Sequence, residues 1–164
     1  MKETYTFAAL PQNVAELQAL PEAAMDNPFK TAALTVLAFC RFEGSVEDCH
    51  EMLDFLRGPR GPLSPYDKQF IRDRLRGKEY VARSYLGGTS PANDYTPSQP
   101  YTVTVFDGPY AYTNEGYANI DIRSSGADTP RRVTLRKTKE GKWVLWDQFL
   151  LPDIRQPESA NPWT

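Results

Sequence analysis

The chain has 164 residues, of which 40 % are hydrophobic and 12 % aromatic, and its formal net charge is −2. This composition suits a folded domain with a sizeable core and excludes a disordered chain. The small net charge gives no bulk attraction to nucleic acid or anionic membranes, and no apolar run approaches the ~20 residues of a membrane-spanning helix.

The first half of the sequence predicts four helices, each with a recognisable start signal. Asn13 begins a short helix, Asn27 and Pro28 begin one that runs to about Phe42, Ser45 caps a helix over Val46–Leu56, and Ser64 and Pro65 begin one that ends at about Arg76. Asparagine and serine can accept a hydrogen bond from the free N–H groups of a first turn, and proline suits the first helical position. The second helix is apolar nearly all round, so we expect it at the centre of the core.

The second half predicts strands. A short strand is expected at Tyr80–Tyr85, residues 84–100 are loop-like, and four strands follow at Tyr101–Asp107, Tyr117–Arg123, Arg132–Thr138 and Lys142–Phe149. The last four alternate apolar and polar residues, which is typical of an antiparallel sheet with one buried face. The residues expected on that buried face are Val103, Val105, Ile120, Ile122, Val133, Leu135, Trp143 and Leu145.

This order of elements predicts an α+β fold, with N-terminal helices (about 10–77) packed on one face of a C-terminal antiparallel β-meander (about 80–150). Prolines make the segment after the last strand irregular. The length fits one domain over residues 1–164.

Two resemblances extend this interpretation. The hairpin from Val133-Thr-Leu-Arg-Lys to Gly141-Lys-Trp143-Val-Leu-Trp146 resembles the last hairpin of the nuclear-transport-factor-2-like fold, which implies a cone-shaped sheet. The whole chain resembles a family of uncharacterised single-domain proteins of Gram-positive anaerobic bacteria. That resemblance is carried by Asn27-Pro-Phe-Lys-Thr-Ala-Ala-Leu-Thr-Val, Ser64-Pro-Tyr, Asp73-Arg-Leu-Arg-Gly77, Tyr95-Thr-Pro-Ser-Gln-Pro-Tyr101 and Trp146-Asp-Gln-Phe-Leu-Leu-Pro-Asp-Ile154. It implies no activity.

No motif in the chain predicts a catalytic residue, a metal site or a cofactor. His50 is the only histidine, and we interpret it as a solvated helix residue. Cys40 and Cys49 flank a predicted turn; they are expected to be two buried thiols, with a disulfide as the alternative. Because the N-terminus lacks an export signal, we expect a cytoplasmic protein.

The polar face of the sheet holds the first set of candidate binding residues: Asp121, Arg123, Arg136 and Trp146, with Tyr110 and Tyr112 on the loop beside it. In a cone-shaped fold this face would form a pocket for a small polar ligand, or for acid–base chemistry by Asp121. In an open sheet it would be a solvated ladder of cross-strand pairs, with Arg136 stacked on Trp146, and we favour the ladder.

Two further groups of residues have a functional and a structural interpretation. Lys68, Arg72 and Arg76 share one face of the fourth helix, so they form either an anion-binding patch or a solvated face. Seven of the nine tyrosines lie between Tyr80 and Tyr117. They form a recognition surface or, as we expect, anchor the long loops.

Together these observations predict a small non-catalytic binding module whose partner is another protein. The alternatives are a small-molecule-binding protein or enzyme with a pocket on a curved sheet, and an anion-binding module based on the fourth helix. Membrane or nucleic-acid binding is not expected, and the sequence does not indicate an oligomeric state.

Overall fold

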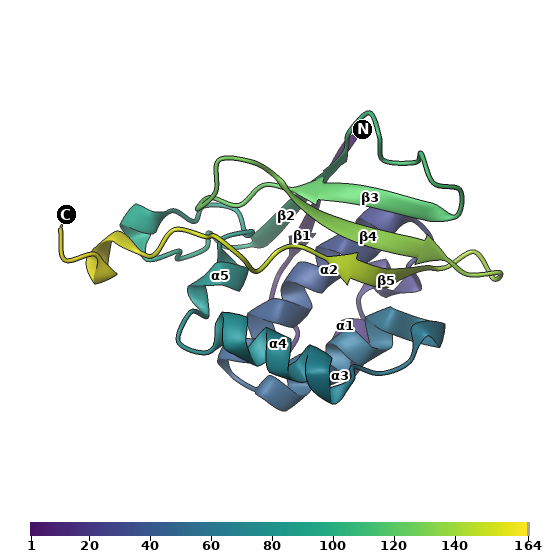
Figure 1. Cartoon of the computed structure of the whole chain (residues 1–164), viewed down its shortest axis with the longest axis horizontal. Coiled ribbons are helices and arrows are strands. Elements are labelled where there is room, and N and C mark those ends of the chain that lie inside the picture. Colours follow the sequence, from purple (N-terminus) through teal and green to yellow (C-terminus); the bar gives the residue numbers. More distant parts are fainter. Residues whose placement is uncertain (164) are drawn as a thin grey trace.

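The computed structural model describes residues 1–163, with a helical layer on one face of a five-stranded antiparallel sheet (Figure 1). In this range the α-helices are α1 (Val14–Gln18), α2 (Pro28–Cys40), α3 (Val46–Arg57), α4 (Pro65–Leu75) and α5 (Tyr80–Arg83). The strands are β1 (Lys2–Phe7), β2 (Tyr101–Asp107), β3 (Tyr117–Ile122), β4 (Arg131–Lys137) and β5 (Trp143–Gln148). Short 3-10 turns lie at η1 (Pro21–Ala24), η2 (Arg41–Glu43), η3 (Gly58–Arg60), η4 (Pro91–Asn93) and η5 (Glu158–Ala160). The predicted α+β arrangement is confirmed.

The predicted helix starts are also confirmed, because their capping residues make the expected bonds. The Asn27 side chain accepts a hydrogen bond from the Lys30 amide at 2.9 Å, and the Ser64 hydroxyl accepts one from the Asp67 amide at 3.0 Å. The Asp67 carboxylate in turn accepts from the Ser64 amide, which completes a capping box.

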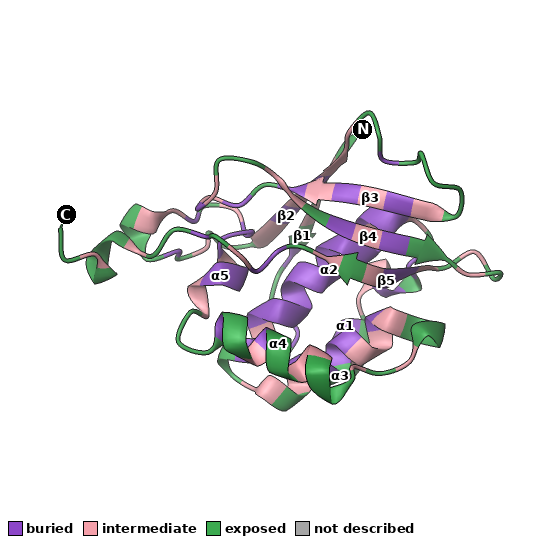
Figure 2. Ribbon diagram, viewed as in Figure 1, coloured by how far each residue is buried: buried purple, intermediate pink, exposed green. Residues whose placement is uncertain are grey.

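Helix α2 crosses beneath the sheet and contacts all five strands. It forms a continuous buried band in Figure 2, and Leu34 and Leu37 have no exposed surface. The predicted inward residues of the strands pack against it; all are buried except Trp143, which is partly buried against the core. The apolar pattern of α2 therefore predicted its central place correctly.

The strands run in the order β1-β2-β3-β4-β5, so each β-strand from β2 onwards pairs with the next along the chain. Strand β1 was not predicted. It pairs with β2 along its whole length, from Lys2 opposite Phe106 to Phe7 opposite Tyr101, and forms one edge of the sheet. As an edge strand it has few apolar residues, so its pattern is weak.

Two sequence interpretations are wrong. The predicted strand Tyr80–Tyr85 is helical as far as Arg83, and the following Ser84 hydroxyl donates a hydrogen bond to the Val81 carbonyl at 2.6 Å. Short apolar runs do not distinguish a strand from a helix turn. His50 is buried rather than solvated, with 8 % of its surface exposed, because α4 packs over this part of α3.

The two cysteines are free thiols, as predicted, and both are buried. Burial raises the pKa of Cys40 to about 12 and also raises the pKa of Cys49. Neither thiol is therefore ionised near neutral pH.

Candidate functional site

The sheet opens between β2 and β3, and this opening creates the largest hollow described. Strands β1 and β2 pair over six residues, whereas β2 and β3 pair only from Val105 to Asp107. The free side of the earlier part of β2 is occupied by the segment after α5, where the Gly87 amide donates a hydrogen bond to the Thr102 carbonyl at 3.0 Å. A loop thus replaces a strand, and the outer face of the sheet becomes concave here.

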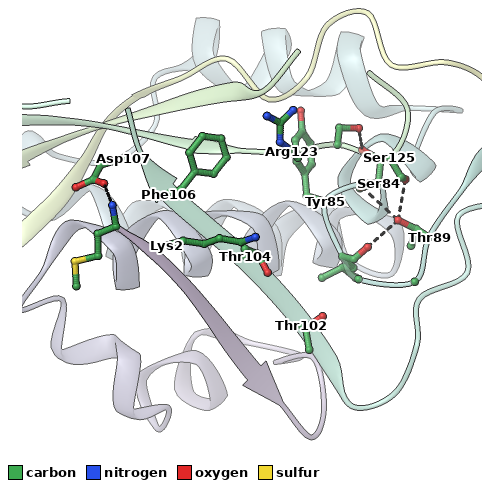
Figure 3. A pocket seen from close by; sticks show the side chains of 15 residues that line it. Lys2, Ser84, Tyr85, Thr89, Thr102, Thr104, Phe106, Asp107, Arg123 and Ser125 are labelled. Atoms are coloured by element: carbon green, nitrogen blue, oxygen red, sulfur yellow. Dashed lines mark hydrogen bonds and ion pairs between the residues drawn. The ribbon is translucent and has the colours of Figure 1, made fainter. Parts of the chain in front are cut away.

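This hollow, which we call the hydroxyl pocket, has a volume of about 890 Å³ (Figure 3). Its lining is rich in hydroxyl groups and comes from four parts of the chain. The lining residues are Met1 and Lys2, Ser84–Thr89, Thr102, Thr104, Phe106 and Asp107, and Arg123–Ser125.

Buried hydroxyls fasten the wall of the hydroxyl pocket. The Ser124 hydroxyl donates to the Ser84 hydroxyl at 2.7 Å. The Ser84 carbonyl accepts from both the amide and the hydroxyl of Ser125, at 2.9 and 3.2 Å. The Thr89 hydroxyl lies 2.9 Å from that of Ser125 and donates to the Leu86 carbonyl at 2.7 Å. The segment after α5 is therefore tied to the segment after β3, which gives the pocket a fixed wall.

Two glycines let this wall lie close to β2 and to the loop that precedes it. A Cβ atom at Gly87 would lie 2.2 Å from the Thr102 hydroxyl oxygen, and one at Gly88 would lie 1.9 Å from the Ser98 hydroxyl oxygen. Gly88 also has a φ of +81°, which side-chain-bearing residues rarely adopt. Larger residues at these positions would push the loop outward and change the pocket.

The charge balance of the hydroxyl pocket is positive. Lys2 and Arg123 are exposed, and neither forms an ion pair with any residue in the range 1–163. The guanidinium of Arg123 lies over the Phe106 ring at 5.6 Å. The single carboxylate, Asp107, is bound by the Met1 amine, and it also raises the pKa of Tyr112 after burial, the larger cause.

The predicted site residues of the outer sheet face do not form one cluster. Arg123 lines the hydroxyl pocket, while Arg136 and Trp146 lie near the other edge of the sheet. Tyr110 and Tyr112 are on the β2–β3 loop and are 71 % and 51 % exposed.

Asp121 lines none of the hollows described here. Its carboxylate lies 3.7 Å from the Arg132 guanidinium and only 16 % of its side chain is exposed. Burial raises its pKa, and the charge of Arg132 opposes the shift. This arrangement matches a cross-strand pair.

Arg136 stacks on Trp146, as predicted, with its guanidinium carbon 4.7 Å from the ring centroid. Arg60, from η3, lies 4.6 Å from the centroid of the same ring. Trp146 has no partner in the β4–β5 register, because Thr134 pairs with Asp147 and Leu135 with Leu145. This β-bulge could not be read from the sequence alternation.

The fourth-helix cations are partly separated from one another. Lys68 and Arg72 are close enough to His50 to lower its pKa, after the larger effect of burial, whereas Arg76 caps the end of α4 and is exposed. None of the three lines a hollow described here.

A smaller hollow of about 270 Å³ lies between α4 and β5, and we call it the aromatic groove. Three of its lining side chains are exposed aromatics: Tyr66 at 77 %, Phe70 at 37 % and Phe149 at 50 %. Tyr, Trp and Arg are enriched at the centres of protein interfaces. This groove also includes Arg60 and Trp146.

The main residues that the sequence interpretation missed are Ser84, Thr89, Ser125, Lys2 and Arg60. Their relevance depends on the unpredicted strand β1, on the opening between β2 and β3, and on the position of η3. Only the Gly87-Gly88 pair gave a signal, since glycine in a loop often marks a close backbone approach.

The chain matches a family described as "Domain of unknown function (DUF6935)" over residues 9–158, and it belongs to that family. No curated protein and no solved structure matches it. The resemblance of the last hairpin to the nuclear-transport-factor-2-like fold therefore stays a prediction. Across residues 1–163 no helix has the length and apolar character needed to cross a bilayer. The same residues contain no group of three or more His, Cys, Asp or Glu side chains placed to hold a metal ion.

Proposed function

We propose that this domain binds a small, negatively charged polar molecule in the hydroxyl pocket. The observation that carries the proposal is the opening of the sheet after the three β2–β3 pairs, which leaves a concave hollow with a fixed wall. Its volume of about 890 Å³ falls within the ~300–1,000 Å³ typical of small-molecule sites.

The lining supports a ligand with both polar and apolar parts. Thr102 and Thr104 present side chains from the floor, and Phe106 and Leu86 add apolar surface. Lys2 and the Arg123 guanidinium supply positive charge without a competing ion pair in the described chain. A carboxylate or phosphate group on the ligand would complement them.

The hydroxyls of the wall support binding rather than turnover. The Ser84 hydroxyl donates a hydrogen bond to the Val81 carbonyl and accepts one from the Ser124 hydroxyl. Both bonds are internal to the fold and occupy the oxygen that a nucleophile would use. A serine nucleophile needs an adjacent general base, and the one carboxylate of the lining is bound by the Met1 amine. We place this function in the cytoplasm, a proposal supported by the buried free thiols of Cys40 and Cys49.

The test is an NMR titration of the whole chain with a panel of small carboxylates, phosphate esters and their neutral analogues. Thr104→Tyr would fill the floor of the hydroxyl pocket. Thr134→Tyr is the matched control, because Thr134 is also a part-buried outer-face threonine with one cross-strand hydroxyl bond, 2.8 Å to Asn119, and lines none of the hollows. Arg123→Gln tests whether the positive charge of Arg123 contributes to the binding of an anionic ligand.

The proposal predicts saturable NMR shifts for residues of the hydroxyl pocket in the native sequence and in Thr134→Tyr. The same shifts should be absent in Thr104→Tyr. Arg123→Gln should weaken the binding of anionic ligands by about tenfold and leave the affinity for neutral analogues unchanged. Absence of any saturable ligand, or binding that Thr104→Tyr does not alter, would overturn it.

Recognition of another protein is the second candidate function. The exposed aromatics around the groove, Tyr66, Phe70 and Phe149, favour it. The two candidates use different surfaces, so Phe149→Ser should leave binding in the hydroxyl pocket unchanged and weaken only a protein partner.

A further inference from the structure

A third hollow, of about 540 Å³, lies on the outer face near the β4–β5 hairpin and shares Arg60 and Trp146 with the aromatic groove. We call it the cationic hollow, because four of its nine lining residues are basic and one is acidic. The nine lining residues are Pro59, Arg60, Arg136, Lys137, Thr138, Lys139, Glu140, Val144 and Trp146. It shares no lining residue with the hydroxyl pocket.

The cations of this hollow form no direct ion pair in the described chain. Arg60 nevertheless lies near Asp67: burial would raise the pKa of Asp67, but hydrogen bonds with Ser64 and the charges of Arg57 and Arg60 lower it. Within residues 1–163, no ion pair is formed by Arg60, Arg136, Lys137 or Lys139, and their side chains donate no hydrogen bond. The lone acid, Glu140, is exposed at the hairpin turn. The two guanidiniums of this hollow therefore keep unused donors, whereas the Lys137 ammonium lies over the Trp143 ring at 5.9 Å.

Aromatic rings hold the two guanidiniums in place. Arg136 lies over Trp146 at 4.7 Å and over Tyr117 at 5.4 Å, and Arg60 lies over Trp146 at 4.6 Å. The rings of Tyr117 and Trp146 meet edge to face at 5.9 Å. Stacking uses the face of a guanidinium and leaves its N–H edge available for an oxyanion.

The backbone beneath Arg60 is also well supported. Val144 is buried on the outer side of β5, where a Cβ atom at Gly58 would lie 2.8 Å from its Cγ1 atom. The Arg57 guanidinium donates to the Gly61 carbonyl at 2.8 Å, which closes the loop. Because both arginines are already ordered, binding an anion would cost little side-chain entropy.

We infer that the cationic hollow is a second ligand site, which binds a multiply charged oxyanion such as a phosphoryl group. The negative charge would lie against the guanidinium edges of Arg60 and Arg136, which both stack on Trp146. This site is independent of the proposed function of the hydroxyl pocket.

The test uses inorganic pyrophosphate and inorganic phosphate as probes, with sodium chloride at matched ionic strength as the reference. The signals followed by NMR are the indole N–H of Trp146, assigned with Trp146→Phe, and the guanidinium N–H signals of both arginines. Arg60→Gln and Arg136→Gln remove one donor group each. Arg76→Gln is the matched control, since it removes an exposed cation outside the hollow.

We expect saturable shifts of the Trp146 and arginine signals with pyrophosphate and none with chloride. Arg60→Gln and Arg136→Gln should each weaken binding about tenfold, against less than about twofold for Arg76→Gln. Arg60 lies on an exposed turn, so its variant remains informative if Arg136→Gln fails to fold. Shifts that chloride reproduces, or an equal loss in Arg76→Gln, would mean that these arginines only stack on the ring and would overturn the inference.

Discussion

The Tyr95 hydroxyl donates a hydrogen bond of 2.6 Å to the main-chain carbonyl of Arg155, near the end of the described chain. The Tyr95 side chain has no exposed surface and its ring stacks on Tyr80, with centroids 5.4 Å apart. The Arg155 amide donates to the Gly126 carbonyl at 2.9 Å. The long loop, the segment after β3 and the C-terminal tail therefore meet at one tyrosine.

Tyr95→Phe should lower the free energy of unfolding by about 0.5–1.5 kcal/mol, because the Arg155 carbonyl loses its donor and the ring is kept. Urea unfolding measures the change. Tyr110→Phe is the control, since Tyr110 is 71 % exposed, and it should change stability by less than about 0.5 kcal/mol. Equal effects of the two substitutions would contradict an anchoring role for Tyr95.

The tyrosine pattern shows what a sequence can predict about loops and what it cannot. The crowding of tyrosines between 80 and 117 indicated that some of them anchor the loops, and Tyr95 does so, as does Tyr85, whose hydroxyl donates to the Leu150 carbonyl. Both acceptors lie on the C-terminal segment, tens of residues away. No local pattern identifies such partners.

Leu37→Ala should lower the free energy of unfolding by ~2–5 kcal/mol, because Leu37 is fully buried in α2 beneath the sheet and its truncation leaves a cavity. Denaturant unfolding is again the measurement. A change below ~0.5 kcal/mol, the scale of an ordinary surface substitution, would place α2 outside the core.

The elements were more predictable from the sequence than the sites. Caps such as Asn27 and Ser64, and the alternation in β2–β5, reflect local physics and gave bounds within about two residues for α2, α3 and α4 and for these strands. The hydroxyl pocket depends instead on where the β2–β3 pairing stops. The pairing of Arg60 with Trp146 needs a β-bulge and the η3 turn together. The Gly/Pro run at 58–62 indicates a turn, but no local pattern indicates the bulge or places the turn against β5.

Because of His50, the free energy of unfolding should decrease as the pH falls below about 6.5. Burial lowers the pKa of His50, as do Lys68 and Arg72, while Asp54 and Glu47 oppose the shift. Its Nε2 atom is also buried without a hydrogen-bond partner. The folded chain therefore resists protonation of His50, whereas the unfolded chain accepts a proton near pH ~6.5, so stability is lost as the pH falls through that value.

The measurement is the free energy of unfolding at pH 7.5 and 5.5 for the native sequence and for His50→Leu. The variant should lose less stability between the two pH values, because this chain has no other histidine. An identical loss in both proteins would show that His50 titrates normally in the folded state.

Asp121→Asn should change stability by no more than about 1 kcal/mol at pH 7, because cross-strand ion pairs near the surface contribute little. Burial raises the pKa of Asp121, so the ionised side chain costs the folded state some stability above that pKa, and the cost disappears as the pH falls below it. The free energy of unfolding of Asp121→Asn, taken relative to that of the native sequence, should therefore be higher at pH 7 than at pH 3. Urea unfolding at both pH values, with an NMR titration of the Asp121 carboxyl carbon, checks the sign. A loss above about 2 kcal/mol at pH 7 would mean that the pair with Arg132, 3.7 Å away, contributes strongly to the fold.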